Sequence, residues 1–265
     1  MRHVHRADRV VASWPLVDRR GWLALAGSGL LAAALPRLAC AQTAPERDHR
    51  LQLELPILAE DAAAVPIQVS VDHPMEPDHF IRWIDVRIDR DPVPHKGRLV
   101  FTPASGRAFA AFTFRSGTGG VVKATAECSR HGQFTATREV RVADGGCATG
   151  SEVVNRDRMG QPQLRVARPG RAGEVVEIRT KVDFPSHTGL ATRGGKIVRD
   201  APELYIRQAQ LYLDDQLVTE FQMTSAVSPN PLLRLPLRAS KSGTVRAVFV
   251  SSEGARWETS QPLRV

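Results

Sequence analysis

The sequence predicts an all-β protein, and three observations support this fold class. From Leu51 onward, short segments such as 67–71 and 81–88 alternate apolar and polar residues, which is the pattern of half-buried strands. Pro, Gly, Asp and Ser separate these segments, as expected for the turns of antiparallel sheets. No segment after residue 41 shows the 3.6-residue apolar period of an amphipathic helix. We therefore expect an all-β fold built as an antiparallel β-sandwich.

Residues 1–41 have the pattern of an export signal. Arg19-Arg20 precede an apolar run over 22–35, and the segment ends in Ala39-Cys40-Ala41. The double arginine resembles the twin-arginine signal of bacteria. We expect cleavage after Ala41 and a periplasmic mature protein without a membrane span, because the apolar run is too short to cross a bilayer. A lipid anchor on Cys40 is the alternative, which Arg37 disfavours.

Composition narrows the function classes. The chain of 265 residues has a formal charge of +8, but its first 41 residues carry six Arg and two Asp, so the mature part has only about +4. Its arginines are scattered among acids without a basic run, which argues against nucleic-acid binding. The sequence also lacks a nucleophile triad, paired catalytic carboxylates and a phosphate-binding loop. We therefore expect a protein that is not an enzyme.

An internal repeat divides the mature chain. Val71-Asp72-His73-Pro74 matches Val182-Asp183-Phe184-Pro185, and Phe80-Ile81-Arg82 matches Tyr205-Ile206-Arg207. The ends match as well, with Gly120 and Gly243 each opening a similar strand. The polar stretch between the repeats has no periodicity. These features predict a first sandwich over 42–147, a linker over 148–163 and a second sandwich over 164–265.

Cys147 lies at the end of the first repeat, directly after Gly145 and Gly146. Together with the segments 55–61 and 65–67, this ending resembles the SoxY subunit of thiosulfate-oxidising systems, and the segments 184–190, 205–207 and 227–231 resemble its SoxZ partner. The chain as a whole is similar to the fused SoxYZ-like carriers that accompany quinoprotein dehydrogenases. The resemblance implies two immunoglobulin-like antiparallel β-sandwiches in tandem. It also implies that Cys147 carries a sulfur group to partner enzymes. The family's second glycine pair is replaced here by Ala148-Thr149.

A second group of residues has the chemistry of a metal site. His73 and His79 flank a proline-containing loop, and Cys128 and His131 form a Cys-x-x-His turn. Three imidazoles and one thiolate suit a borderline metal such as iron, and zinc less well. The spacing is similar to that of superoxide reductases, the desulfoferrodoxin-like proteins with mononuclear iron. That family has a fourth histidine before a Val-Pro, whereas Glu54 precedes Leu55-Pro56 here.

Other interpretations of these residues stay open. The histidines and Cys128 can have purely structural roles, and Cys128 can form a disulfide with Cys147 in an oxidising compartment. We expect His49 and His95 to be solvated loop residues, and His187 is a weaker candidate for a site role.

The main expectation is a periplasmic carrier that presents Cys147 to redox or sulfur-transfer enzymes. The alternatives are a mononuclear iron redox protein and an accessory module of a quinoprotein dehydrogenase.

Overall fold

The structure is a computed structural model that describes residues 49–143, 159–167 and 171–265. The predicted export signal and the candidate carrier Cys147, with Gly145 and Gly146, lie outside the described residues. The described part consists of strands, turns and one short 3-10 helix, η1 (Pro103–Ser105), and contains no α-helix. It also has no helix with the length and apolar character to cross a membrane. The predicted all-β fold class is confirmed.

The strands fall into two sequential sets. The first set comprises β1 (Leu51–Glu54), β2 (Leu58–Ala59), β3 (Val65–Val71), β4 (Ile81–Ile88), β5 (His95–Phe101), β6 (Ala108–Phe114), β7 (Gly120–Cys128) and β8 (Gly132–Val142). The second comprises β9 (Pro162–Val166), β10 (Val175–Val182), β11 (Leu190–Arg193), β12 (Lys196–Arg199), β13 (Ile206–Leu213), β14 (Gln216–Met223), β15 (Leu232–Arg238), β16 (Gly243–Ser251) and β17 (Arg256–Leu263). We call residues 49–143 the first half and 159–265 the second half.

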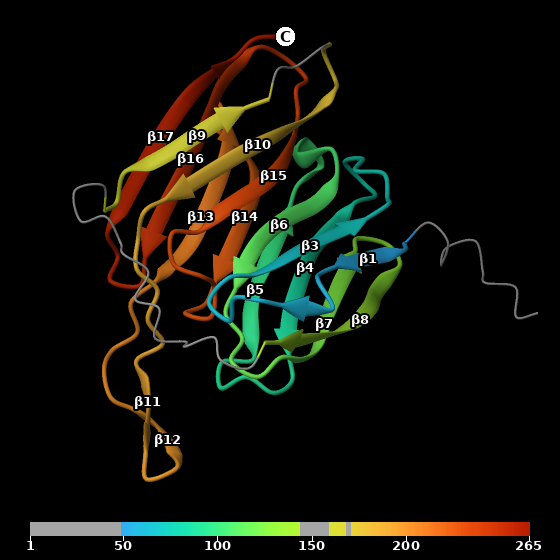
Figure 1. Ribbon diagram of the computed structural model, residues 1–265. Helices are drawn as coiled ribbons and strands as arrows, with labels where there is room; N and C mark the ends of the chain where they lie inside the picture. The colour runs from blue at the N-terminus through green and yellow to red at the C-terminus, as the bar shows by residue number, and fades with distance from the viewer. Residues whose placement is uncertain (1–48, 144–158, 168–170) are drawn as a thin grey trace, which may run out of the picture. The chain divides into compact units, whose positions relative to one another are not determined.

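The two halves share their sheets (Figure 1). The two larger sheets have the orders β1-β3-β6-β15-β10-β9 and β17-β16-β13-β14-β5-β4-β7-β8-β2, so each contains strands of both halves. β11 and β12 form a separate two-stranded sheet. β5 and β14 pair over five residues, from Phe101 with Thr219 to Gly97 with Met223, whereas β6 and β15 meet only at Ala111 and Arg234. Within each larger sheet, the strands of the second half follow in the same order from one edge as their counterparts in the first half follow from the other edge. The edge strand β2 alone has no counterpart in these sheets. The two halves are therefore related by a pseudo-two-fold axis.

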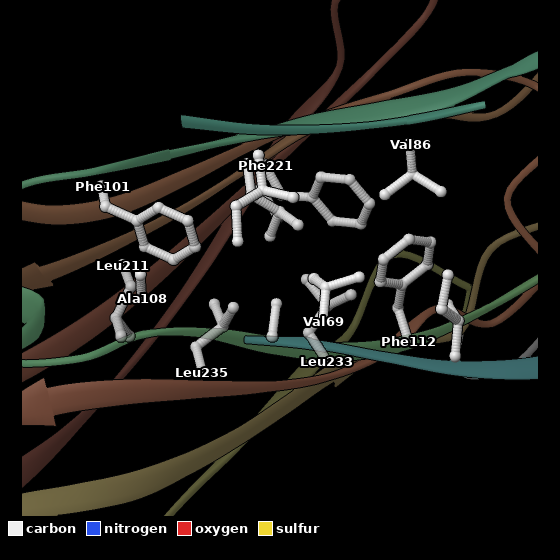
Figure 2. Close-up of a cluster of buried hydrophobic side chains, with 14 of the residues drawn as sticks. Val69, Val86, Phe101, Ala108, Phe112, Leu211, Phe221, Leu233 and Leu235 are labelled. Atoms are coloured by element: carbon white, nitrogen blue, oxygen red, sulfur yellow. The ribbon is translucent and has the colours of Figure 1, made fainter. Parts of the chain in front are cut away.

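The core runs through both halves (Figure 2). From Ile84 to Ile88 of β4, every second side chain is apolar and buried, because successive residues of a strand point to opposite faces. Phe112 of β6 packs against Phe221 of β14 with ring centroids 4.7 Å apart. Leu233 belongs to the same buried cluster. The apolar contact between the halves therefore belongs to one hydrophobic core, and burial of this kind is the main stabilising term of a fold.

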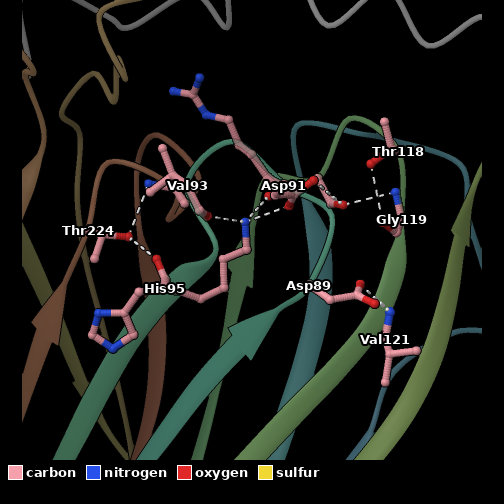
Figure 3. Close-up of polar contacts among 12 residues, drawn as sticks. Asp89, Asp91, Val93, His95, Thr118, Gly119, Val121 and Thr224 are labelled. Atoms are coloured by element: carbon pink, nitrogen blue, oxygen red, sulfur yellow. Dashed lines mark hydrogen bonds and ion pairs between the residues drawn. The ribbon is translucent and has the colours of Figure 1, made fainter. Parts of the chain in front are cut away.

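A buried ion pair fixes the connection between β4 and β5 (Figure 3). The Lys96 ammonium is 1% exposed and donates to Asp91 Oδ2 at 2.6 Å, to Val93 O at 3.1 Å and to Arg115 O at 2.8 Å. Burial lowers the pKa of Lys96, and the hydrogen bond from Lys96 to Asp91 opposes this shift. All three ammonium hydrogens thus have acceptors, which offsets the cost of burying the charge.

Candidate metal centre

Strand pairing in the first half brings distant histidines together. β1 and β3 are antiparallel with Leu51 opposite Val71. His49 lies two residues before β1 and His73 two residues after β3, so this register places the two histidines opposite each other. Their ring centroids are 4.5 Å apart, and both side chains are buried. The His49 ring also stacks on Phe134 of β8 at a centroid distance of 4.4 Å.

The other two histidines come from two neighbouring turns. Glu76 and His79 exchange two backbone hydrogen bonds of 3.0 and 3.1 Å around Pro77, and Pro favours such a turn because its φ is fixed. His131 lies in the tight turn between β7 and β8, in which Cys128 pairs with Gly132. Gly132 has a φ of 82°, a left-handed conformation that glycine adopts without strain.

Hydrogen bonds hold these two turns against each other. The backbone N–H of Phe80 donates to Ser129 Oγ at 3.1 Å, and the backbone N–H of Ser129 donates to Phe80 O at 2.9 Å. The Arg130 guanidinium donates to Asp78 O at 3.0 Å and also pairs with the Asp78 carboxylate. The turn with His131 is thereby fixed next to the loop with His79.

Five donor atoms converge at this point, from His49, His73, His79, Cys128 and His131, all within 4.8 Å of one another. Three nitrogen contacts of 3.1 Å join His73 Nε2 to His79 Nε2, His79 Nε2 to His131 Nδ1, and His131 Nδ1 to His49 Nε2. Cys128 Sγ lies 3.7 Å from both His73 Nε2 and His131 Nδ1. His49, His73 and Cys128 are buried, His79 is half-buried and His131 is exposed.

The local contacts prepare His73 and Cys128 as electron-pair donors. His73 Nδ1 contacts the Pro74 carbonyl, which can only accept, so Nδ1 carries the proton and the lone pair of Nε2 faces the cluster. Burial lowers the pKa of His73; the hydrogen bond to Pro74 opposes this, and the neighbouring histidines lower it further. The backbone N–H of Arg130 donates to Cys128 Sγ at 3.4 Å, so this sulfur acts as a hydrogen-bond acceptor in the turn.

The cluster fits a metal ion better than a hydrogen-bond chain. A proton on a ring nitrogen points in one direction, so His79 Nε2 cannot serve both its 3.1 Å neighbours well by hydrogen bonding. Two imidazole nitrogens bound side by side to one ion at about 2.1 Å would lie about 3 Å apart, which is close to the separation in the three nitrogen contacts. Four imidazoles and a thiolate suit a borderline transition metal such as iron. A bound ion would be held by the five donors of His49, His73, His79, Cys128 and His131.

The structure brings together all four residues proposed as metal ligands, His73, His79, Cys128 and His131. The expectation for His49 was wrong, because it is 2% exposed and supplies the fourth imidazole. In the superoxide reductase pattern, the fourth histidine directly precedes the Val-Pro pair that corresponds to Leu55-Pro56, just after β1. His49 instead lies before β1, in a segment with no periodic pattern. Its position opposite His73 depends on strand register, which the sequence alone does not give.

Two further histidines lie away from the cluster. His95 was also expected in a solvated loop, but it starts β5, is half-buried and contacts Asp85 Oδ1 at 3.0 Å. His187 is exposed and bridges to Leu204 through the backbone. Among the described residues Cys128 is buried and has no disulfide partner, and Cys147, its predicted alternative partner, lies outside them.

The fold and the donor cluster define a protein of two sheet-sharing β-sandwiches with a His/Cys centre in the first. The family model of sulfur oxidation protein SoxY matches residues 37–147, and that of sulphur oxidation protein SoxZ matches residues 164–262. The chain therefore belongs to these families as a fused SoxYZ-like protein, and it falls within a group of sulfur-oxidation carriers. Among curated proteins, none matches the chain.

Solved structures similar to this chain include superoxide reductases. The neelaredoxin from Ignicoccus hospitalis is 27% identical, with a TM-score of 0.36 over 41% of this chain and 93% of its own. The reduced neelaredoxin from Archaeoglobus fulgidus is 21% identical, with a TM-score of 0.30 over 36% of this chain and 90% of its own.

Proposed function

We propose that this SoxYZ-like protein is a periplasmic carrier, not an enzyme, and that the thiol of Cys147 holds its sulfur cargo. The observation that supports this role most directly is that the SoxY match ends at Cys147. The last described residue before it is Ala143, whose backbone N–H donates to Ala59 O at 3.0 Å.

The proposed transfer exchanges sulfur without net oxidation. The Cys147 thiolate attacks the terminal sulfur of a persulfide on a donor protein. A sulfur–sulfur bond to Cys147 forms while the donor's sulfur–sulfur bond breaks, and the donor leaves as a thiolate that takes up the proton released by Cys147. Cys147 then carries the persulfide, and the reverse step delivers it to an acceptor thiolate. Sulfur-transfer enzymes are therefore the expected partners.

Mass spectrometry of protein purified from its native host under sulfur supply tests the carrier role. We expect a reducible adduct with the mass of one or more sulfur atoms on the peptide that contains Cys147. The Cys147→Ser variant should lose the adduct, whereas Cys128→Ser should keep it. An adduct that persists in Cys147→Ser, or a wild-type protein that never carries one, would contradict the proposal.

A second function, as a mononuclear iron redox protein, is favoured by one observation: His49 completes a set of four imidazoles and a thiolate. Iron bound there would supply one-electron redox chemistry. The chain's own contribution would be to hold the ion through the buried His49, His73 and Cys128, and to leave access on the side of the exposed His131. The choice of a quinoprotein dehydrogenase as the partner rests on the family resemblance alone.

Metal analysis of anaerobically purified protein separates the two functions. The redox proposal expects about one iron per chain, with a thiolate charge-transfer absorption that Cys147→Ser leaves unchanged. If the protein is only a carrier, Cys147 should hold its normal cargo even in protein that has been stripped of metal. A wild-type protein that neither contains iron nor binds added iron(II) would exclude the second function and leave the first intact.

A further inference from the structure

A side chain from the second half reaches the ligand loop of the first half, the segment from His73 to His79. Arg238 ends β15, and its Nη2 donates to the Met75 carbonyl at 3.3 Å. The same nitrogen lies 3.9 Å from Glu76 Oε1. Met75 and Glu76 lie between the two histidines, so this contact connects the second half directly to the metal centre.

The absence of a side chain at Gly106 leaves room for the Arg238 side chain. An added Cβ at Gly106 would lie only 2.9 Å from Arg238 Cβ and 2.7 Å from Val175 Cγ2. Gly106 has a φ of 69°, a conformation that glycine adopts most easily. Arg238 Nε is buried without a hydrogen-bond partner among the described residues. Such an atom costs free energy, and the hydrogen bond from Nη2 to the ligand loop helps to offset this cost.

The ligand loop needs this support because it has little regular structure of its own. Besides the two backbone hydrogen bonds between Glu76 and His79 and the contacts of Arg130 with Asp78, it is held by the buried Met75 side chain, which is 1% exposed. Arg238 at the Met75 carbonyl is its contact with the second half. The positions of His73 and His79 depend on the loop's conformation. Groups that orient metal ligands typically change metal affinity about 10- to 100-fold when they are removed.

We propose that Arg238 is a positioning residue through which the SoxZ-type half controls how tightly the SoxY-type half retains its metal. This inference rests on the proposed metal centre. Arg238 touches no donor atom of the cluster; it acts by fixing the Met75 carbonyl between two ligands. The association of the halves and the retention of metal are therefore coupled in the full chain.

The experiment compares Arg238→Met, Arg238→Lys and the control Arg234→Met in the full chain. Arg234 lies on the same strand and is similarly exposed, but it pairs with Glu177 of β10. Each protein is loaded anaerobically with iron(II), or with cobalt(II) as a spectroscopic probe, and metal release to an excess of chelator is timed. We expect release about 10-fold faster in Arg238→Met, with a shifted thiolate charge-transfer band. Arg238→Lys should restore most of the retention, and Arg234→Met should behave like wild type.

The outcomes are distinct from those that test the metal centre itself. A wild-type chain that binds neither ion overturns both proposals. A wild-type chain that binds metal and releases it at the same rate as Arg238→Met overturns only this inference. Thermal unfolding without metal checks whether Arg238→Met is folded. If it is unfolded, Arg238→Gln takes its place in the comparison, and release at the wild-type rate from that variant overturns the inference.

Discussion

The two halves of the molecule share one arrangement of strands, but they place different residues at the corresponding site. The first half pairs Ile81 with Cys128, and the second half pairs Ile206 with Ser251 at the corresponding place. In the first half Ser129 binds the backbone of Phe80 at 2.9 and 3.1 Å, and in the second Ser252 binds that of Tyr205 at 2.8 and 3.3 Å. The repeat predicted from the sequence thus extends to single hydrogen bonds.

The corresponding positions differ in the donor atoms they supply. Where the first half has His49, His73, His79, Cys128 and His131, the second half has Gly160, Phe184, Leu204, Ser251 and Gly254. In the second half the site is filled by aromatic packing, with the rings of Phe184 and Trp257 5.3 Å apart. Trp257 corresponds to Phe134, which stacks on His49.

The fold therefore does not require the donors. The second half keeps the same turns and strand register, although the packed rings of Phe184 and Trp257 take the place of the five ligands. The stability of this strand arrangement therefore comes from its core and its backbone hydrogen bonds. A cluster of four imidazoles around a point is then costly without an ion, since polar groups in a partly buried site need partners. The comparison favours a functional role for the cluster.

The strongest change should follow from giving the first half the second half's residue, in Cys128→Ser. The substitution keeps the size of the side chain but removes the thiolate ligand. We expect iron(II) affinity to fall by at least about 100-fold, because a direct ligand matters more than the outer groups that already change affinity about 10- to 100-fold. The charge-transfer absorption should disappear.

The matched control is Ser251→Ala in the second half, which should leave both the metal content and the spectrum unchanged. Equal iron binding by wild type and Cys128→Ser would show that Cys128 is not a ligand and that the imidazoles hold the ion without it.

The next contrast concerns charge on the shared sheet. Asp85 of β4 faces Arg98, whereas at the corresponding place Gln210 of β13 faces Glu220. Burial alone would raise the pKa of Asp85, but hydrogen bonds from His95, Arg87 and Arg98 outweigh it and lower the pKa to about 2. The folded state therefore gains stability from the ionised carboxylate above about pH 4, and loses it as the pH falls from about 4 to about 2.

We expect Asp85→Asn to lower the free energy of unfolding by about 2 kcal/mol at pH 7. The difference from wild type should fall to a few tenths of a kcal/mol near pH 2, where about half of the Asp85 carboxyl groups are protonated in the folded state. Glu220→Gln in the second half should cost about 1 kcal/mol or less at pH 7, because Glu220 accepts from the neutral amides of Gln210 and Gln222. Urea unfolding at both pH values measures these differences, and a pH-independent cost of Asp85→Asn would contradict the low pKa.

Much of this molecule is predictable from its sequence, and the limits have physical causes. The alternating residues of segments such as 81–88 predict strands because the period of two is local. The spacing of His73, His79, Cys128 and His131 predicts a shared site because each pair lies within one loop or turn. The role of His49 and the pairing of β5 with β14 depend on contacts between distant segments, which leave no local pattern. The role of Cys147 as the carrier residue stays a prediction from the family resemblance.

The finest comparison makes the same small change in both halves. Ser129→Ala and Ser252→Ala each remove the acceptor of one backbone N–H, from Phe80 at 3.1 Å and from Tyr205 at 3.3 Å. Each should lower the free energy of unfolding by about 1 kcal/mol, measured by urea unfolding of metal-free protein. Only Ser129→Ala should also speed iron(II) release to a chelator, because Ser129 lies between Cys128 and His131 and ties their turn to His79. If both variants release metal equally fast, the serine supports the strand arrangement alone and the ligands hold their places without it.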